Sequence, residues 1–136
     1  MQTQLAPQFA NTPEGIEAAR ILGKCVHCGF CLETCPTYLL TANELDSPRG
    51  RIYLIKDMLE KNVLADARAT YHIDRCLSCL SCMTTCPSSV DYMHLVDHAR
   101  EFIEKKAPRS MSERFKRDLL AYMLPRPKIF RAALRL

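Results

Sequence analysis

Eight cysteines, arranged in two short runs, are the residues of this sequence best suited to chemistry. Each run reads C-x2-C-x2-C-x3-C-P, and the second run repeats the first at a constant offset of 51 residues. Reduced cysteines at such close spacing bind metals as thiolates, whereas oxidised cysteines form disulfides. The first run holds Cys25, Cys28, Cys31 and Cys35, followed by Pro36, and the second holds Cys76, Cys79, Cys82 and Cys86, followed by Pro87.

Iron–sulfur chemistry fits this spacing best. Three thiolates separated by two residues can wrap one face of a cubane cluster, and in two-cluster ferredoxins the fourth cysteine ligates the other cluster. The prolines lack an N–H group, so we expect Pro36 and Pro87 to turn the chain away after the last ligand. The repeat therefore predicts two [4Fe–4S] clusters with crossed ligands: Cys25, Cys28, Cys31 and Cys86 for cluster 1, and Cys76, Cys79, Cys82 and Cys35 for cluster 2.

Other uses of the cysteines fit less well. Structural zinc prefers paired C-x2-C elements and would leave a surplus thiol in each run, so a zinc-stabilised interaction module is the alternative from a different functional class. A disulfide framework belongs to exported proteins, and the N-terminal residues show neither the basic nor the apolar region of a secretory signal. Radical chemistry on S-adenosylmethionine would need a different cysteine spacing and a longer chain.

Composition narrows the function further. The 136 residues correspond to about one domain, and no apolar run approaches the ~18–20 residues of a membrane span. The formal charge of +4 is uneven, because residues 100–136 carry 11 basic and 4 acidic residues while residues 1–99 carry 8 and 11. A basic end can bind an anionic membrane surface or an acidic partner, but a solvated helix or linker is the simpler interpretation. We see no nucleotide-binding glycine loop and no catalytic constellation, and we expect no nucleic-acid partner.

Helices are expected to position the cysteine runs. Capping signals predict one helix from Thr12 to Gly23, one that starts at Ser47-Pro48 and continues to Glu60, and one from Ser110 to about Leu124. Apolar periodicity adds helices over about 66–75 and 92–106, and no strand pattern is visible. The fold class is therefore mainly α. The pattern resembles an α-helical ferredoxin domain with two [4Fe–4S] clusters, here residues 1–107, followed by a basic helical extension, 108–136.

Several residues near the runs have two possible roles. Arg49 and Arg51 could neutralise cluster charge or grip a partner carboxylate, or they could form a solvated first helical turn. His27 could hydrogen-bond a cluster sulfur or lie in an exposed loop. We expect the remaining histidines to lie on helix surfaces and four aromatic residues to shield the clusters. The histidines are His72, His94 and His98, and the aromatic residues are Phe30, Tyr38, Tyr53 and Tyr92.

The stretch from Asp46 to Lys56, taken with both cysteine runs, resembles the iron–sulfur subunit of bacterial glycolate oxidase (glycolate dehydrogenase) in its N-terminal, two-cluster part. The resemblance implies an electron-transfer subunit of an oxidoreductase complex, with the eight cysteines as cluster ligands and no substrate-converting residue. Flavoprotein partner subunits, which hold FAD, would oxidise glycolate to glyoxylate and pass electrons through the clusters toward a quinone or another acceptor. The iron–sulfur subunit of a related glycerol-3-phosphate or lactate dehydrogenase is the alternative with the same mechanism.

Members of this family continue into cysteine-rich repeats that the present sequence does not contain. We therefore expect residues 108–136 to be a linker toward such a region. The expected location is cytoplasmic, with peripheral association at the cytoplasmic face of the inner membrane as a further possibility.

Overall fold

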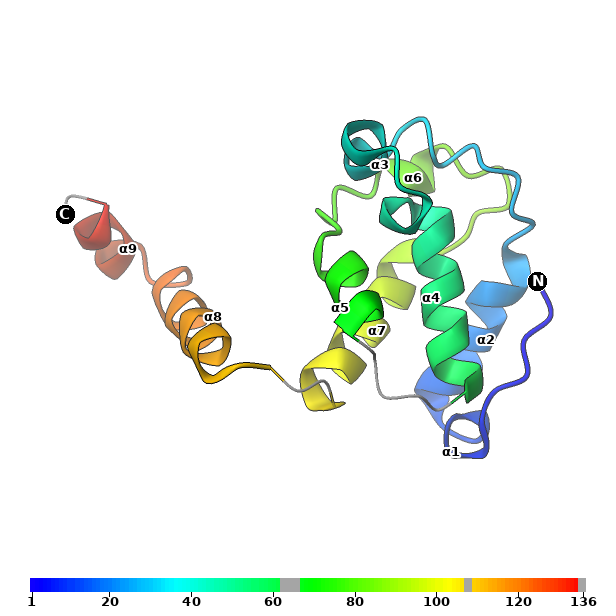
Figure 1. Cartoon of the computed structure of the whole chain (residues 1–136), viewed down its shortest axis with the longest axis horizontal. Helices are drawn as coiled ribbons and strands as arrows, with labels where there is room; N and C mark the ends of the chain where they lie inside the picture. The colour runs from blue at the N-terminus through cyan, green and yellow to red at the C-terminus, as the bar shows by residue number, and fades with distance from the viewer. Residues whose placement is uncertain (62–66, 107–108, 135–136) are drawn as a thin grey trace.

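The computed structural model is helical in the residues that it describes, which are 1–61, 67–106 and 109–134 (Figure 1). The helices are α1 (Pro7–Ala10), α2 (Pro13–Lys24), α3 (Pro36–Thr41), the 3-10 helix η1 (Glu44–Asp46), α4 (Pro48–Lys61), α5 (Ala67–Asp74), α6 (Ser81–Thr84), α7 (Tyr92–Lys106), α8 (Met111–Met123) and α9 (Pro127–Ala133). No strand occurs in these ranges, so the prediction of a mainly α fold is confirmed.

Side-chain caps start the longer helices where the sequence predicts them. The hydroxyl of Thr12 accepts a hydrogen bond from the N–H of Gly15 at 3.1 Å, and the hydroxyl of Ser47 accepts one from Gly50 at 2.9 Å. The hydroxyl of Ser110 likewise accepts one from Glu113 at 3.3 Å. Each bond satisfies an N–H group that has no partner within the helix. For the helix predicted over residues 66–75, residue 66 lies outside the described residues, and α5 covers most of the remaining range.

Four helices, α2, α4, α5 and α7, enclose the apolar core. A fully buried aliphatic or aromatic side chain contributes about 1.5–3 kcal/mol to the free energy of folding. The two cysteine runs lie side by side at one end of this helical bundle (Figure 1). The most buried aliphatic members of the core are Ile21, Leu22, Ile55, Ile73, Leu95, Val96 and Ile103.

Gly50 lets η1 lie directly on the first turn of α4. A Cβ atom at this position would lie 2.0 Å from the carbonyl oxygen of Glu44, which no side chain tolerates. The close approach places Asp46 and Ser47 inside the protein, with both residues completely buried. This junction therefore delivers polar groups to the region beside the cysteines.

Pro36 occupies the first position of α3, where its fixed φ angle suits a helix and its missing N–H costs nothing. The short helices α1, α3 and α6 are not predicted, because four to six residues are too few to show a periodic apolar pattern. Helix α9 lies within the helical extension predicted over residues 108–136.

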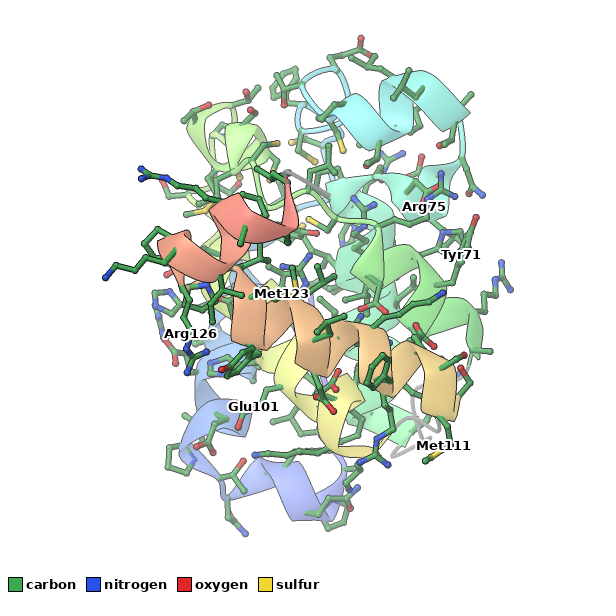
Figure 2. All side chains as sticks on the ribbon, turned by 90° about the vertical axis from the view of Figure 1, so that its left-hand side faces the viewer. Tyr71, Arg75, Glu101, Met111, Met123 and Arg126 are labelled. Atoms are coloured by element: carbon green, nitrogen blue, oxygen red, sulfur yellow. The ribbon has the colours of Figure 1, made fainter. Side chains whose placement is uncertain are left out.

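The C-terminal helices α8 and α9 form an arm that extends from the bundle (Figure 1). Neither helix has a buried residue. Figure 2 looks at this arm and shows Met111 and Met123 near the two ends of α8. Ion pairs connect its base to the bundle, with Arg109 at 2.9 Å and Arg117 at 3.1 Å from the carboxylate of Asp74. Among the helices described, none is both long and apolar enough to cross a membrane.

Candidate iron–sulfur sites

The backbone of the two cysteine loops repeats as closely as their sequence. In both loops the residues before and after the second cysteine have positive φ angles. The angles are 57° at His27 and 87° at Gly29 in the first loop, and 51° at Ser78 and 59° at Leu80 in the second. Left-handed backbone costs a residue other than glycine about 1–2 kcal/mol. Strain repeated at equivalent positions indicates that both loops are shaped to surround a ligand rather than to maximise stability.

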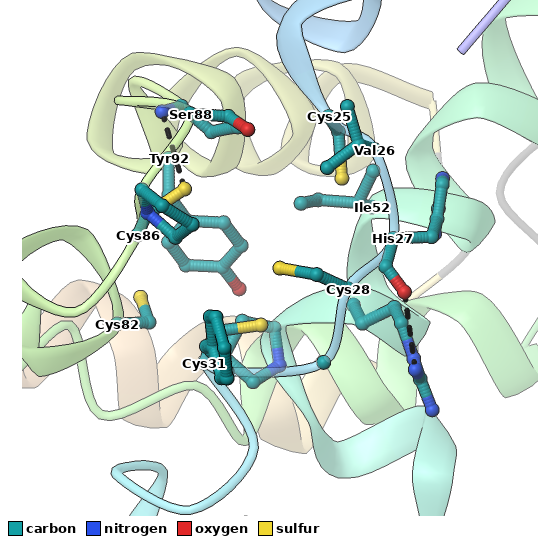
Figure 3. A pocket seen from close by; sticks show the side chains of 16 residues that line it. Cys25, Val26, His27, Cys28, Cys31, Ile52, Cys82, Cys86, Ser88 and Tyr92 are labelled. Carbon is teal, nitrogen blue, oxygen red and sulfur yellow. Dashed lines mark hydrogen bonds between the residues drawn. The ribbon is translucent and has the colours of Figure 1, made fainter.

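The first loop surrounds a cavity whose wall includes a cysteine from the second run. Figure 3 shows the side chains of Cys25, Cys28, Cys31 and Cys86 around a common space, with the ring of Tyr92 beside them. The lining is otherwise mainly apolar and includes Ile52 and Val90. The structure thus brings together the four cysteines predicted for cluster 1, together with Cys82, which also borders this space.

A second cavity lies beside the first. Its wall contains the four cysteines predicted for cluster 2, from both runs, together with Arg51 and Thr37. Three residues, Pro48, Cys82 and Tyr92, border both cavities and so form the partition between them. The four predicted cysteines are Cys35, Cys76, Cys79 and Cys82.

The donor sets fit [4Fe–4S] clusters. All eight cysteines are free thiols in the structure. In the described part of the chain, no group of three or more His, Cys, Asp or Glu side chains lies close enough together to hold a single metal ion. Burial raises the pKa of Cys31 to about 11 and that of Cys82 to about 12, with neighbouring thiols adding to both. Thiolates in such surroundings need a bound metal to offset their charge.

A buried polar network adjoins the second cavity. The guanidinium of Arg51, only 1% exposed, donates hydrogen bonds to the carbonyl of His72 at 2.7 Å and to the hydroxyl of Thr37 at 3.1 Å. It also lies 3.9 Å from the sulfur of Cys35 and 3.7 Å from the carboxylate of Asp46. Of the two roles considered for Arg51, the solvated helical turn is therefore wrong.

Asp46 is the anionic centre of this network. Its carboxylate lies 2.9 Å from Nδ1 of His72 and 3.4 Å from the guanidinium of Arg75. Although burial alone would raise the pKa of Asp46, the bond to His72 and the charge of Arg75 outweigh it and lower the pKa. The prediction that His72 lies on a helix surface is wrong, because its ring is buried against this carboxylate.

The other side-chain predictions give mixed results. Tyr92 is buried at the partition and can shield both cavities. Phe30 lines the first cavity although it is more than half exposed, whereas Tyr53 is exposed and lines neither cavity. His27 contacts the thioether of Met1 and the ring of Tyr53 rather than a cysteine sulfur. His94 is an exposed surface residue, as predicted, while His98 is half-buried beside Glu17. Arg49 pairs with Glu44 at 2.7 Å.

Comparisons with known proteins identify the same region. A family model described as a 4Fe-4S dicluster domain matches residues 24–90. The chain is 51% identical over 132 residues to the glycolate oxidase iron–sulfur subunit of Escherichia coli strain K12, covering 97% of this chain and 32% of that protein. It is 39% identical over 94 residues to the probable glycolate oxidase iron–sulfur subunit of Bacillus subtilis strain 168, covering 68% and 21%.

A more distant relative is the succinate dehydrogenase iron–sulfur subunit of Coxiella burnetii, 26% identical over 99 residues, which cover 67% of this chain and 42% of that protein. No solved structure is significantly similar to the chain. The chain spans about a third or less of the glycolate oxidase subunits that it matches. It therefore contains a 4Fe-4S dicluster domain that binds two [4Fe–4S] clusters, within a sequence related over nearly its whole length to glycolate oxidase iron–sulfur subunits.

Proposed function

We propose that the two cavities hold the two clusters with crossed ligands. The first set is Cys25, Cys28, Cys31 and Cys86, and the second set is Cys76, Cys79, Cys82 and Cys35. Support comes from the cavity walls, since each wall contains three cysteines of one run and the last cysteine of the other, with Cys82 bordering both cavities. Crossed ligation ties the two runs together, so cluster binding also stabilises the fold.

When bound, each cluster accepts and donates a single electron. The residues of the chain hold this chemistry in place and keep water away from it. Apolar Ile52 and Val90 line the first cavity, and the aromatic ring of Tyr92 closes the space between the two. The short partition keeps the sites close together, as electron transfer between them requires.

We further propose that the chain is the electron-transfer part of a glycolate-oxidising complex. The observation that carries this proposal is the 51% identity across 97% of the chain to a glycolate oxidase iron–sulfur subunit. Flavoprotein subunits with FAD would oxidise glycolate to glyoxylate and pass the electrons to this chain, which in turn would pass them toward a quinone or another acceptor. The chain itself contributes cluster ligands and no group that converts substrate.

The proposed location is the cytoplasm, at the membrane surface if the acceptor is a quinone. Eight cysteines that must stay reduced to bind iron favour a reducing compartment. The arm formed by α8 and α9 is basic and amphipathic, with Phe115, Leu119 and Tyr122 exposed. We propose residues 1–107 as the cluster domain and 108–136 as a linker to further parts of the subunit.

Substrate-driven reduction tests the proposed function. The complex is purified anaerobically, and its electron paramagnetic resonance (EPR) spectrum is recorded before and after addition of glycolate, glycerol-3-phosphate or lactate. We expect cluster signals to appear with glycolate alone. Reduction by glycerol-3-phosphate or lactate instead would assign the chain to a related dehydrogenase. Reduction by dithionite but by none of the three substrates would contradict the proposed complex.

A further inference from the structure

We infer that Arg51, Tyr92 and Ser81 are positioning residues that give the second cysteine set the higher reduction potential of the two. The inference rests on the proposed ligand sets. Hydrogen bonds to ligand sulfurs and nearby positive charge both favour the reduced, more negative form of an iron–sulfur cluster. The two cavities differ in these two features while matching in most others.

The second set receives side-chain donors on three of its four sulfurs. The hydroxyl of Tyr92 donates to the sulfur of Cys76 at 3.6 Å, and the guanidinium of Arg51 approaches the sulfur of Cys35 at 3.9 Å. The main-chain N–H and the hydroxyl of Ser81 both donate hydrogen bonds to the sulfur of Cys79.

Main-chain groups alone serve as donors to the first set in the described part of the chain. The N–H of Val90 donates to the sulfur of Cys86 at 3.5 Å, and the backbone of Arg49 bonds to Cys31. The sequence repeat explains the difference between the sets. The position equivalent to Ser81, 51 residues earlier, is Phe30, which has no hydroxyl group.

Charge adds to the same asymmetry. Beside the second cavity two guanidinium groups, those of Arg51 and Arg75, share the single carboxylate of Asp46. Beside the first loop, Arg49 is neutralised by its own partner, Glu44. Two positive charges and one negative charge therefore lie beside the second cavity, and the guanidinium of Arg51 is the one that reaches a cysteine sulfur.

Two further positive groups are matched between the loops. The amino group of Met1 bonds to the carbonyl of Cys25 at 3.0 Å, and Arg100 bonds to the equivalent carbonyl of Cys76 at 2.6 Å. The central cysteines of the two loops, Cys28 and Cys79, are both exposed. Burial acts in the opposite direction, because Cys35 and Cys82 of the second set are buried whereas Cys25 alone is buried in the first set. The donors and positive charge at the second set must therefore outweigh this difference in burial.

A redox titration followed by EPR tests this order of potentials. The anaerobically purified, cluster-loaded protein is compared with the variants Tyr92→Phe and Ser81→Ala, each of which removes one hydroxyl group. We expect both variants to lower the higher of the two potentials and to leave the lower one unchanged. For Tyr92→Phe we expect about a tenfold shift in the partition of one electron between the sites, which corresponds to about 59 mV.

Ser88→Ala is the matched control, because it removes a hydroxyl from the wall of the first cavity at the repeat position of Thr37. It should move neither potential. Arg51→Lys is a weaker test, since this buried side chain also supports the scaffold. A shift of the lower potential in Tyr92→Phe, or no shift beyond that of Ser88→Ala, would overturn the inference.

Iron and acid-labile sulfide are measured on the same samples. About eight of each per chain is the content of two cubane clusters. If this content is present and the higher potential does not move in Tyr92→Phe, the inference is overturned but the proposed ligand sets are not. A content of about four of each would overturn the proposed ligand sets, and the inference with them.

Discussion

Arg51 and Asp46 connect the helical bundle to the second cysteine set through contacts between individual side chains. Asp46 holds two guanidinium groups and the ring of His72, and Arg51 in turn reaches Cys35. A residue whose folded pKa is lowered contributes stability that is complete above its ordinary pKa. For Asp46 this contribution is present at neutral pH and is lost as the pH falls through the lowered pKa of its folded state.

Replacing this carboxylate tests the role of the network. Asp46→Asn keeps the shape of the side chain but leaves Arg51 and Arg75 without a counter-charge. Because breaking a buried ion pair costs about 3–5 kcal/mol, we expect a much lower thermal midpoint for loss of cluster absorbance at pH 7. Asp57→Asn removes an exposed partner of Lys61 and should leave the midpoint unchanged. Equal midpoints for both variants would show that the network does not stabilise the site.

For single residues, the sequence predicts which cysteines come together better than it predicts the side chains around them. The cysteines follow from spacing, because the geometry of a cubane cluster dictates it locally. The Asp46–His72 pair, 26 residues apart, and the contact of Tyr92 with Cys76 arise only from tertiary packing. His72 was misplaced for the same reason, since no local signal shows which face of a short helix is covered.

Helix junctions carry these side chains to the cysteines. The junction of η1 with α4 depends on Gly50, where the carbonyl of Glu44 fills the space that a Cβ atom would need. The α4 helix itself was predictable, because Ser47, Pro48 and the apolar residues that follow give unambiguous local signals. The short helices α3 and η1 were not, because their conformations depend on contacts with the rest of the fold.

A pair of glycine substitutions tests the junction. Gly50→Ala forces the backbone apart, and overpacking of this severity should destabilise the protein by about 3 kcal/mol. The matched control is Gly23→Ala in α2, where nothing lies within 4 Å of the added Cβ. This variant should stabilise the protein by about 0.5–1 kcal/mol through helix propensity. The denaturant midpoints of unfolding of both variants are compared with that of the unsubstituted protein. An unchanged midpoint for Gly50→Ala would contradict the close contact between η1 and α4.

The whole molecule consists of a cluster-holding bundle and an arm with no buried residue. Deleting residues 108–136 removes no apolar core side chain. It removes Arg109, whose side chain is only 5% exposed and pairs with Asp74 and Glu104, and surface ion pairs such as Arg117–Asp74. Surface pairs of this kind contribute about 0–1 kcal/mol each. We therefore expect the shortened chain to keep about eight iron atoms and the same reduced EPR spectrum. Loss of either cluster on deletion would contradict the proposed domain boundary.

Crossed ligation is the central claim at this scale, because it makes one structural unit of two cysteine runs. The most direct measurement compares the EPR spectra of dithionite-reduced Cys35→Ala, Cys79→Ala and Cys28→Ala. The account predicts that Cys35→Ala loses the same cluster signal as Cys79→Ala and keeps the signal that Cys28→Ala loses. If Cys35→Ala instead loses the signal that Cys28→Ala loses, each run holds its own cluster and the crossed assignment is wrong.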